Sequence, residues 1–230
     1  LYSSAASDVY KRQDQVRRAT AARPVETVRV TTTASMCLVL TRHLPMLMAA
    51  TPGVVISLLP SRAVLSLARR EAEIAIRMRT PPAEGRLVVR RLARVRVALY
   101  AAASLVPDDM SAELTALPVI GVARDERSRT GAALRRILGD RQPVAILDDT
   151  PLRLHACAAG LGVALLPCLP ADATPGLRRV AELPAEMDED AFLVMHEDLA
   201  ASRPVRAVAD ALVELFRRER AALLGAVNPR

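Results

Sequence analysis

The chain has 230 residues, 51% hydrophobic and 25% charged, which is the composition of a globular protein with one large domain or two small ones. Three cysteines without a Cys-x-x-Cys pair, a 2% aromatic share and no apolar run near the ~20 residues of a membrane span argue against disulfide scaffolds, zinc sites, base-stacking platforms and membrane proteins. The formal charge of +7 is carried by arginines scattered among acids, so we expect solvated faces, not a DNA-binding stripe, in a soluble cytoplasmic protein without a cofactor or metal.

The first 26 residues stand apart from the rest of the sequence. Residues 3–13, SSAASDVYKRQ, look like the translation of a sequencing adapter, and Lys11 is the only lysine of the chain. We therefore treat residues 1–13 as a non-native, adapter-derived segment. Residues 14–26 are polar and alanine-rich, and we interpret them as the remnant of a linker whose upstream domain is missing.

The next residues predict a βαβ unit. Residues 28–33 (VRVTTT) have strand character, and an amphipathic helix follows in which Pro45 either introduces a kink or starts the main part. Pro52 and Gly53 end this helix. Residues 54–59 (VVISLL) are apolar without alternation, which predicts a strand buried on both faces of a parallel sheet.

The pattern then repeats. We expect a helix over 61–70, a third strand over 72–78, a proline-containing loop and a long strand-like stretch over 87–101, near whose end the chain crosses to a second sheet. Further elements follow in chain order: strands near 119–122, 144–147, 163–166 and 192–195, and helices over 130–138, 151–159 and 204–224. This is the pattern of an α/β protein.

Five blocks of sequence carry a resemblance to one family. They are VRVTTTAS with RHLPMLMAATPGV within 28–54, EAEIAIRM at 71–78, RLVVRRLARVRVALYAA at 86–102, AAGLGVALLP at 158–167 and MHEDLAASRPVRAVADAL at 195–212. Together, and in this order, they resemble the effector-binding domain of LysR-type transcriptional regulators. Glu73 stands where that family usually has aspartate in its "DIAIR" strand.

The resemblance implies two Rossmann-like subdomains in a periplasmic-binding-protein-like fold of type 2, with the chain crossing twice, near Tyr100 and near His196. Subdomain I would comprise 27–99 plus 197–225, and subdomain II 100–196. It also implies a homodimer or homotetramer, associated through the helix of the first subdomain and the edge of the second. DNA would be bound only by the missing N-terminal helix-turn-helix of the parent protein.

Three places in the sequence could bind a ligand outside the carboxyl ends of strands, where helix N-termini present free N–H groups. The residues concerned are Thr32, Thr33 and Ser35 after the first strand, Pro60 and Ser61 after the second with Arg77 nearby, and Asp149 and Thr150 after Asp148 in the second subdomain. We hypothesise that a small anionic molecule binds between the subdomains, with Thr33 and Ser35 as donors and Arg77 supplying charge. Each residue also has a structural interpretation: Ser35 and Thr150 as helix caps, Thr32 as a strand residue, and Arg77 paired with Glu73 or another acid.

The remaining motifs are weaker evidence for a function. Gly160-Leu161-Gly162 lacks the third glycine of a dinucleotide-binding loop, and the three histidines fit no catalytic triad, so we expect no enzyme. Cys157 and Cys168 lie among apolar neighbours and are expected to be buried and inert, not redox sensors. The preferred function is thus an effector-sensing domain of a transcription regulator, with a free-standing solute-binding protein as the alternative.

Overall fold

The structure, a computed structural model, describes residues 26–61, 72–78, 86–106, 114, 116–122, 137, 139 and 141–226. The adapter-derived segment and nearly all of the linker remnant lie outside these residues. The same holds for most of the helices expected over 61–70 and 130–138 and for the loop around 81–85. No helix in the described part of the chain has the length and apolar character needed to cross a membrane.

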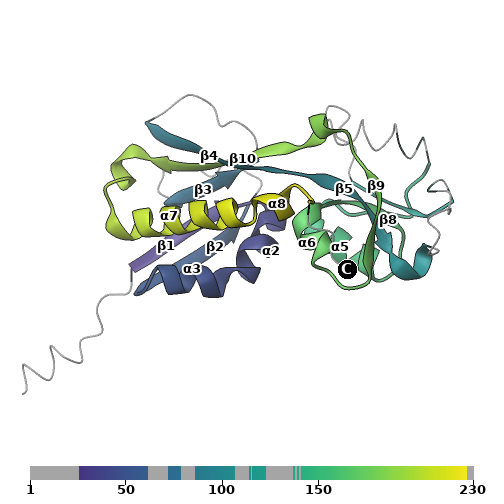
Figure 1. Cartoon of the computed structure of the whole chain (residues 1–230), viewed down its shortest axis with the longest axis horizontal. Helices are drawn as coiled ribbons and strands as arrows, with labels where there is room; N and C mark the ends of the chain where they lie inside the picture. Colours follow the sequence, from purple (N-terminus) through teal and green to yellow (C-terminus); the bar gives the residue numbers. More distant parts are fainter. Residues whose placement is uncertain are drawn as a thin grey trace, which may run out of the picture.

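Two mixed five-stranded sheets form the framework and lie side by side along the long axis (Figure 1). The first sheet has the order β2-β1-β3-β10-β4. Its strands are β1 (Glu26–Thr32), β2 (Val54–Pro60), β3 (Ile74–Arg77), β4 (Leu87–Val95) and β10 (Glu189–His196). The pairing of β1 with β2 and β3 is parallel, as expected for βαβ units, whereas β10 runs antiparallel to both of its neighbours.

The second sheet has the order β7-β6-β8-β5-β9. Its strands are β5 (Val97–Ala102), β6 (Val119–Gly121), β7 (Ala145–Ile146), β8 (Val163–Pro167) and β9 (Leu177–Glu182). Here β6 pairs in parallel with β7 and β8, and β5 lies antiparallel between β8 and β9. Each sheet thus combines parallel pairs with an antiparallel strand next to a crossing, and the chain has the predicted α/β architecture with two subdomains.

The chain passes between the sheets at two short segments. The first is Arg96, the single residue between β4 and β5, and the second is residues 183–188 between β9 and β10. These positions differ from the crossings expected near Tyr100 and His196. The stretch over 87–101 is strand-like throughout, so its sequence does not show where one sheet ends, and 192–195 belongs to the first sheet instead of the second.

Helices cover both sheets. They are α2 (Ala34–Arg42), α3 (Leu44–Ala50), α5 (Thr150–Ala158), α6 (Cys168–Asp172), α7 (Arg203–Arg218) and α8 (Arg220–Leu223), with short 3-10 turns at Ala103–Leu105, Ala185–Met187 and Glu197–Leu199. Pro45 lies in the first turn of α3, so the proline starts a second helix and does not kink a single one. Figure 1 shows α8 at the junction of the two sheets.

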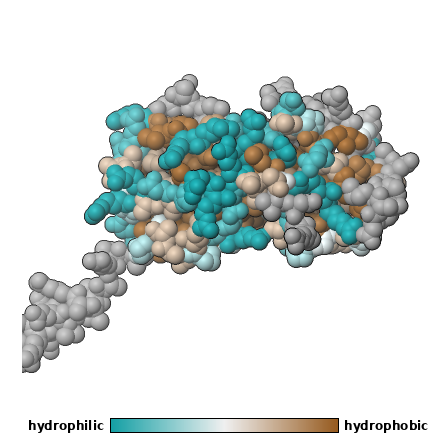
Figure 2. All heavy atoms as spheres, viewed as in Figure 1, coloured by the Kyte–Doolittle hydropathy of each residue, from teal (hydrophilic) through white to brown (hydrophobic). Residues whose placement is uncertain are grey.

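The long helix α7 closes the core of the first sheet. Its apolar positions recur with helical spacing, and all six expected from the sequence are buried: Val205, Val208, Ala209, Leu212, Leu215 and Phe216. Hydrophilic side chains cover the outward side of the molecule along this helix (Figure 2). The amphipathic pattern therefore fixes both the position and the rotation of α7.

The expectation for β2 was wrong in one respect. An apolar run without alternation was expected to be buried on both faces, yet most of β2 is only partly buried and Val55 is 47% exposed. The reason is its place in the sheet, because β2 is an edge strand that pairs only with β1.

We predict that Phe216→Ala destabilises the first subdomain by about 3–5 kcal/mol, because a large buried ring is lost and a cavity is left behind. The Phe216 side chain is 1% exposed and contacts the main core. Urea denaturation followed by circular dichroism measures the change. Arg206→Ala, on the exposed side of the same helix, is the matched control and should leave the midpoint unchanged. Equal destabilisation by both variants would contradict the packing described for α7.

Candidate functional site

A pocket of about 170 Å³ lies where the two sheets meet. Its size suits a compact metabolite, since pockets for drug-sized ligands are roughly 300–1,000 Å³. The described residues that line it come from both sides of the junction: Thr33, Ala34, Ser35, Met36, Val39, Met78, Val95 and Leu223 from elements around the first sheet, Val97, Thr150, Pro167, Leu169 and Pro170 from elements around the second, and Glu189 at the start of β10.

The N-terminus of α2 provides hydroxyl donors to this pocket. Thr33 is the N-cap, and its Oγ1 accepts a hydrogen bond of 3.3 Å from the Met36 N–H. The Oγ atoms of Thr33 and Ser35 lie 3.0 Å apart, so one hydroxyl donates to the other. One hydroxyl proton of this pair is then left to donate to a ligand. The sequence assigned the capping alternative to Ser35, but Thr33 takes that role.

Thr150 provides a second donor from the other side of the junction. Its hydroxyl oxygen accepts a 2.9 Å hydrogen bond from Arg153 Nη2, which leaves the hydroxyl proton to be donated. Arg153 is 8% exposed and also donates to the carbonyls of Leu147 (2.7 Å) and Asp148 (2.8 Å). This buried arginine therefore shapes the β7–α5 loop and orients Thr150. Thr150 is the first residue of α5 and not its cap.

Most of the walls are apolar, and the sequence predicted none of these wall residues. Val95 and Val97 flank Arg96 at the first crossing, and Leu223 ends α8. Met78 and Pro167 lie at the carboxyl ends of β3 and β8, where the rule for ligands in α/β sheets would have placed them. The sequence could not identify these apolar residues, because an apolar residue that lines a pocket has the same sequence pattern as one in the hydrophobic core.

Five of the predicted site residues do not line the pocket, namely Arg77, described below, and four others. Thr32 is fully buried within β1, and its hydroxyl has no hydrogen-bond partner in the residues described. Pro60 is the exposed end of β2, and the Ser61 N–H donates to the Thr32 carbonyl at 2.7 Å. Asp149 is the N-cap residue of α5 without a side-chain capping bond. Thr33, Ser35 and Thr150 are thus the predicted residues that the fold brings together.

Arg77 lies next to the pocket-lining Met78 but is not itself part of the lining. Its Nη1 donates to the carbonyls of Thr31 and Ile76, both at 3.2 Å, while Nη2 is buried and has no hydrogen-bond partner in the described part of the chain. Burial lowers its pKa below the ordinary arginine value. The alternative pairing with Glu73 does not occur, because Glu73 forms a bidentate ion pair with Arg29.

Cys157 and Cys168 are buried free thiols, as expected. Burial raises the pKa of Cys157 to about 11, and burial likewise raises that of Cys168. Thiols in this state are poor nucleophiles at neutral pH. Within the residues described, no group of histidine, cysteine, aspartate or glutamate side chains gathers to hold a metal ion.

Comparison with known proteins gives one consistent result. A family model described as the LysR substrate binding domain matches residues 21–217. No protein with curated function matches the sequence significantly.

Solved structures share the fold at low sequence identity. The regulatory domain of CrgA, a LysR-type transcriptional regulator from Neisseria meningitidis, is 20% identical with a TM-score of 0.67, and the match covers 84% of this chain and 100% of that one. Full-length LysG from Corynebacterium glutamicum with its bound effector Arg is 19% identical (TM-score 0.61, 93% of this chain and 76% of that one). Full-length CbnR in complex with its target DNA is 17% identical (TM-score 0.59, 92% and 77%).

We predict that Arg153→Met destabilises the second subdomain by about 3 kcal/mol, because the carbonyls of Leu147 and Asp148 and the Thr150 hydroxyl lose a charged donor while the apolar stem is kept. Chemical denaturation measures the change. Arg178→Met, at an exposed position of β9, serves as the control and should destabilise the subdomain much less. A stability of Arg153→Met equal to that of the unaltered chain would show that the loop does not depend on Arg153.

Proposed function

Because the chain belongs to the LysR substrate binding domain family, it is the effector-binding domain of a transcription regulator and not an enzyme, and we propose that a small anionic metabolite binds in its pocket. One observation carries the proposal: hydroxyl donors from both sides of the junction, in the Thr33–Ser35 pair and at Thr150, face the same cavity. Since each has a proton left to donate, the complementary ligand carries acceptor oxygens.

Helix dipoles support an anionic ligand. The N-termini of α2 and α5, each nine residues long, both reach the pocket, and amide N–H groups with partial positive charge collect at such ends. Arg77 adds positive charge beside the pocket; its Nη1 is used in two hydrogen bonds, and its Nη2 is buried without a hydrogen-bond partner among the described residues. Thr32, Pro60, Ser61 and Asp149 would act as supports of these contacts and not as ligand contacts.

We further propose that the two subdomains close on the ligand about their two crossings. The sheets divide the described chain into 26–95 with 189–226 and 97–182, a division shifted by a few residues from the one expected. A ligand that contacts both α2 and α5 binds the closed arrangement better than an open one, and so shifts the population toward closure. We propose that the parent regulator acts on DNA in the cytoplasm through a separate DNA-binding domain, and that closure changes how the DNA-binding domains are placed.

Exposed apolar side chains support self-association as a homodimer or a homotetramer. On the first subdomain they are Met48 on α3 and Val55 on the edge strand β2, and on the second they are Val144, Ile146 and Leu152 around the edge strand β7. A two-fold axis would place the exposed apolar side chains of the first subdomain of one copy against those of the second subdomain of the other copy. Two equivalent contacts would then form, and all of these side chains would be covered. Such exposed groups typically mark interaction sites.

The ligand proposal predicts that Ser35→Ala weakens binding of a carboxylate about tenfold, the effect of one lost hydrogen bond to a charged group. A thermal-shift screen of carboxylates first finds a ligand, since at 100 times its dissociation constant it stabilises by about 2.7 kcal/mol. Calorimetric titration then compares variants. Matched compounds with and without an amino group will show whether Glu189 also contacts the ligand.

Ser57→Ala in β2, away from the pocket, is the matched control and should bind as the unaltered chain does. Arg77→Ala tests the charge contribution separately. Unchanged affinity in both Ser35→Ala and Arg77→Ala would refute the assigned donors, while a screen without any stabilising anion would refute the anionic ligand class.

The assembly proposal predicts that Ile146→Asp weakens self-association at least about tenfold, because a carboxylate would be buried without a partner in an apolar contact. Light scattering over a concentration series measures the mass. Leu161→Asp introduces the same charge at an exposed leucine elsewhere in the second subdomain and should leave the mass unchanged. A monomer at all concentrations in the unaltered chain would contradict the proposal.

A further inference from the structure

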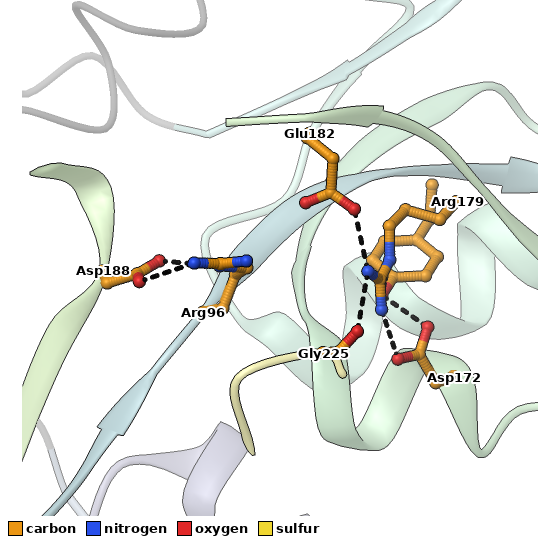
Figure 3. Close-up of polar contacts among 7 residues, drawn as sticks. Arg96, Asp172, Arg179, Glu182, Asp188 and Gly225 are labelled. Atoms are coloured by element: carbon orange, nitrogen blue, oxygen red, sulfur yellow. Dashed lines mark hydrogen bonds and ion pairs between the residues drawn. The ribbon is translucent and has the colours of Figure 1, made fainter. Parts of the chain in front are cut away.

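The two crossings are joined by an ion pair between side chains that do not line the pocket (Figure 3). Arg96, between β4 and β5, binds Asp188, just before β10, through Nε and Nη2 at 3.1 Å each. The Asp188 side chain is 3% exposed and that of Arg96 is 30% exposed, so the carboxylate of this bidentate pair is shielded from water. The neighbours Val95, Val97 and Glu189 line the pocket, because successive side chains of an extended chain point to opposite sides.

A second arginine, Arg179, also joins the two subdomains. Arg179 on β9 of the second sheet donates through Nη1 to the carbonyl of Gly225, just beyond α8, at 3.0 Å (Figure 3). Three side chains of the second subdomain hold the guanidinium in place. These are Asp172 (Nη2 to Oδ2, 2.5 Å), Glu182 (Nη1 to Oε1, 2.8 Å) and Tyr100 (Nε to OH, 3.1 Å).

The network around Arg179 is preorganised. The Tyr100 hydroxyl, which accepts from Arg179, donates to Asp172 Oδ1 at 2.7 Å, and the Arg179 side chain is only 16% exposed. Three bonds to its own subdomain thus fix the guanidinium before it meets Gly225, and little side-chain entropy is lost in that fourth contact. Hydrogen bonds with a charged donor are also stronger than neutral ones.

Gly225 fits this contact in a way that other residues would not. Its φ of +65° lies in the left-handed region, and a Cβ built there would come within 2.8 Å of Arg179 Nη2. The close approach of guanidinium and backbone therefore requires glycine. A substitution at 225 would displace Arg179 from the carbonyl without removing any side chain of the network.

The segment held by Arg179 also reaches the pocket and the first crossing. Leu223, two residues before Gly225, lines the pocket with its side chain, and its carbonyl accepts a 2.9 Å hydrogen bond from the Arg96 N–H. We propose that the Arg179–Gly225 contact is a latch between the subdomains: it holds Leu223 in place as a pocket wall and secures the Arg96 crossing. Release of the latch frees the segment from 223 to 226 and loosens the crossing.

Hydrogen exchange in the full chain tests the latch at one amide. Gly225→Ala should speed exchange of the Arg96 amide about tenfold, as loss of one charge-assisted hydrogen bond implies. Arg179→Gln also gives up the bonds to Asp172, Glu182 and Tyr100 and should speed this exchange at least as much. Amides of β1 serve as the internal reference and should not change. The double variant should exchange no faster than the faster single variant, because both changes break the same contact.

Gly53→Ala is the matched control for backbone strain. Gly53 has a φ of +79° with nothing within 4 Å of a built Cβ, so alanine there is strained but displaces no neighbour. Its Arg96 exchange should stay within about twofold of the unaltered chain, since the site is distant and independent. Equal acceleration by Gly53→Ala and Gly225→Ala, or additive effects in the double variant, would overturn the latch.

The latch rests on the proposed function only in treating the pocket as the effector site. The exchange experiment needs no ligand, so its failure would leave the donors at α2 and α5 untouched. A failed ligand screen would in turn leave the latch standing.

Discussion

The bidentate pair of Arg96 and Asp188 ties together the only two segments that join the sheets in the described part of the chain. Each sheet has its own core, so the angle between them depends on how these segments are held. The same segments present Val95, Val97 and Glu189 to the cavity. Pocket shape and subdomain angle are therefore set by the same few residues, which is the arrangement a sensor needs if ligand contacts are to change its conformation.

Much of the fold could be predicted because its elements have strong periodicity and clear ends. Helix α7 shows an apolar stripe at helical spacing, and β1 is a β-branched run followed directly by Thr33, the N-cap of α2. The crossing at Arg96 could not be located, since strand character continues on both sides of it. The strand β9 was missed because its sequence, LRRVAE, is charged at half of its positions without regular alternation and resembles an exposed loop.

The candidate site could likewise be predicted only in part from the sequence. Thr33, Ser35 and Thr150 follow from the rule that ligands bind at the carboxyl ends of strands, where hydroxyl residues precede helices. The contribution of Arg153 could not be seen, because arginine is usually exposed and only the folded loop shows the carbonyls that it binds. Leu223 lies 190 residues after Thr33 in the sequence, and only the return of the C-terminal helices brings the two residues to one cavity.

Four pocket walls, Met36, Val39, Val95 and Leu223, are also members of the largest buried core. A substitution that reshapes the cavity at these positions also alters packing that stabilises the domain. New ligand preferences would therefore evolve more readily through Met78, Thr150, Leu169 and Pro170, which are only partly buried. The pocket thus has one side on which substitutions cost stability and another side on which ligand specificity can diverge between related proteins.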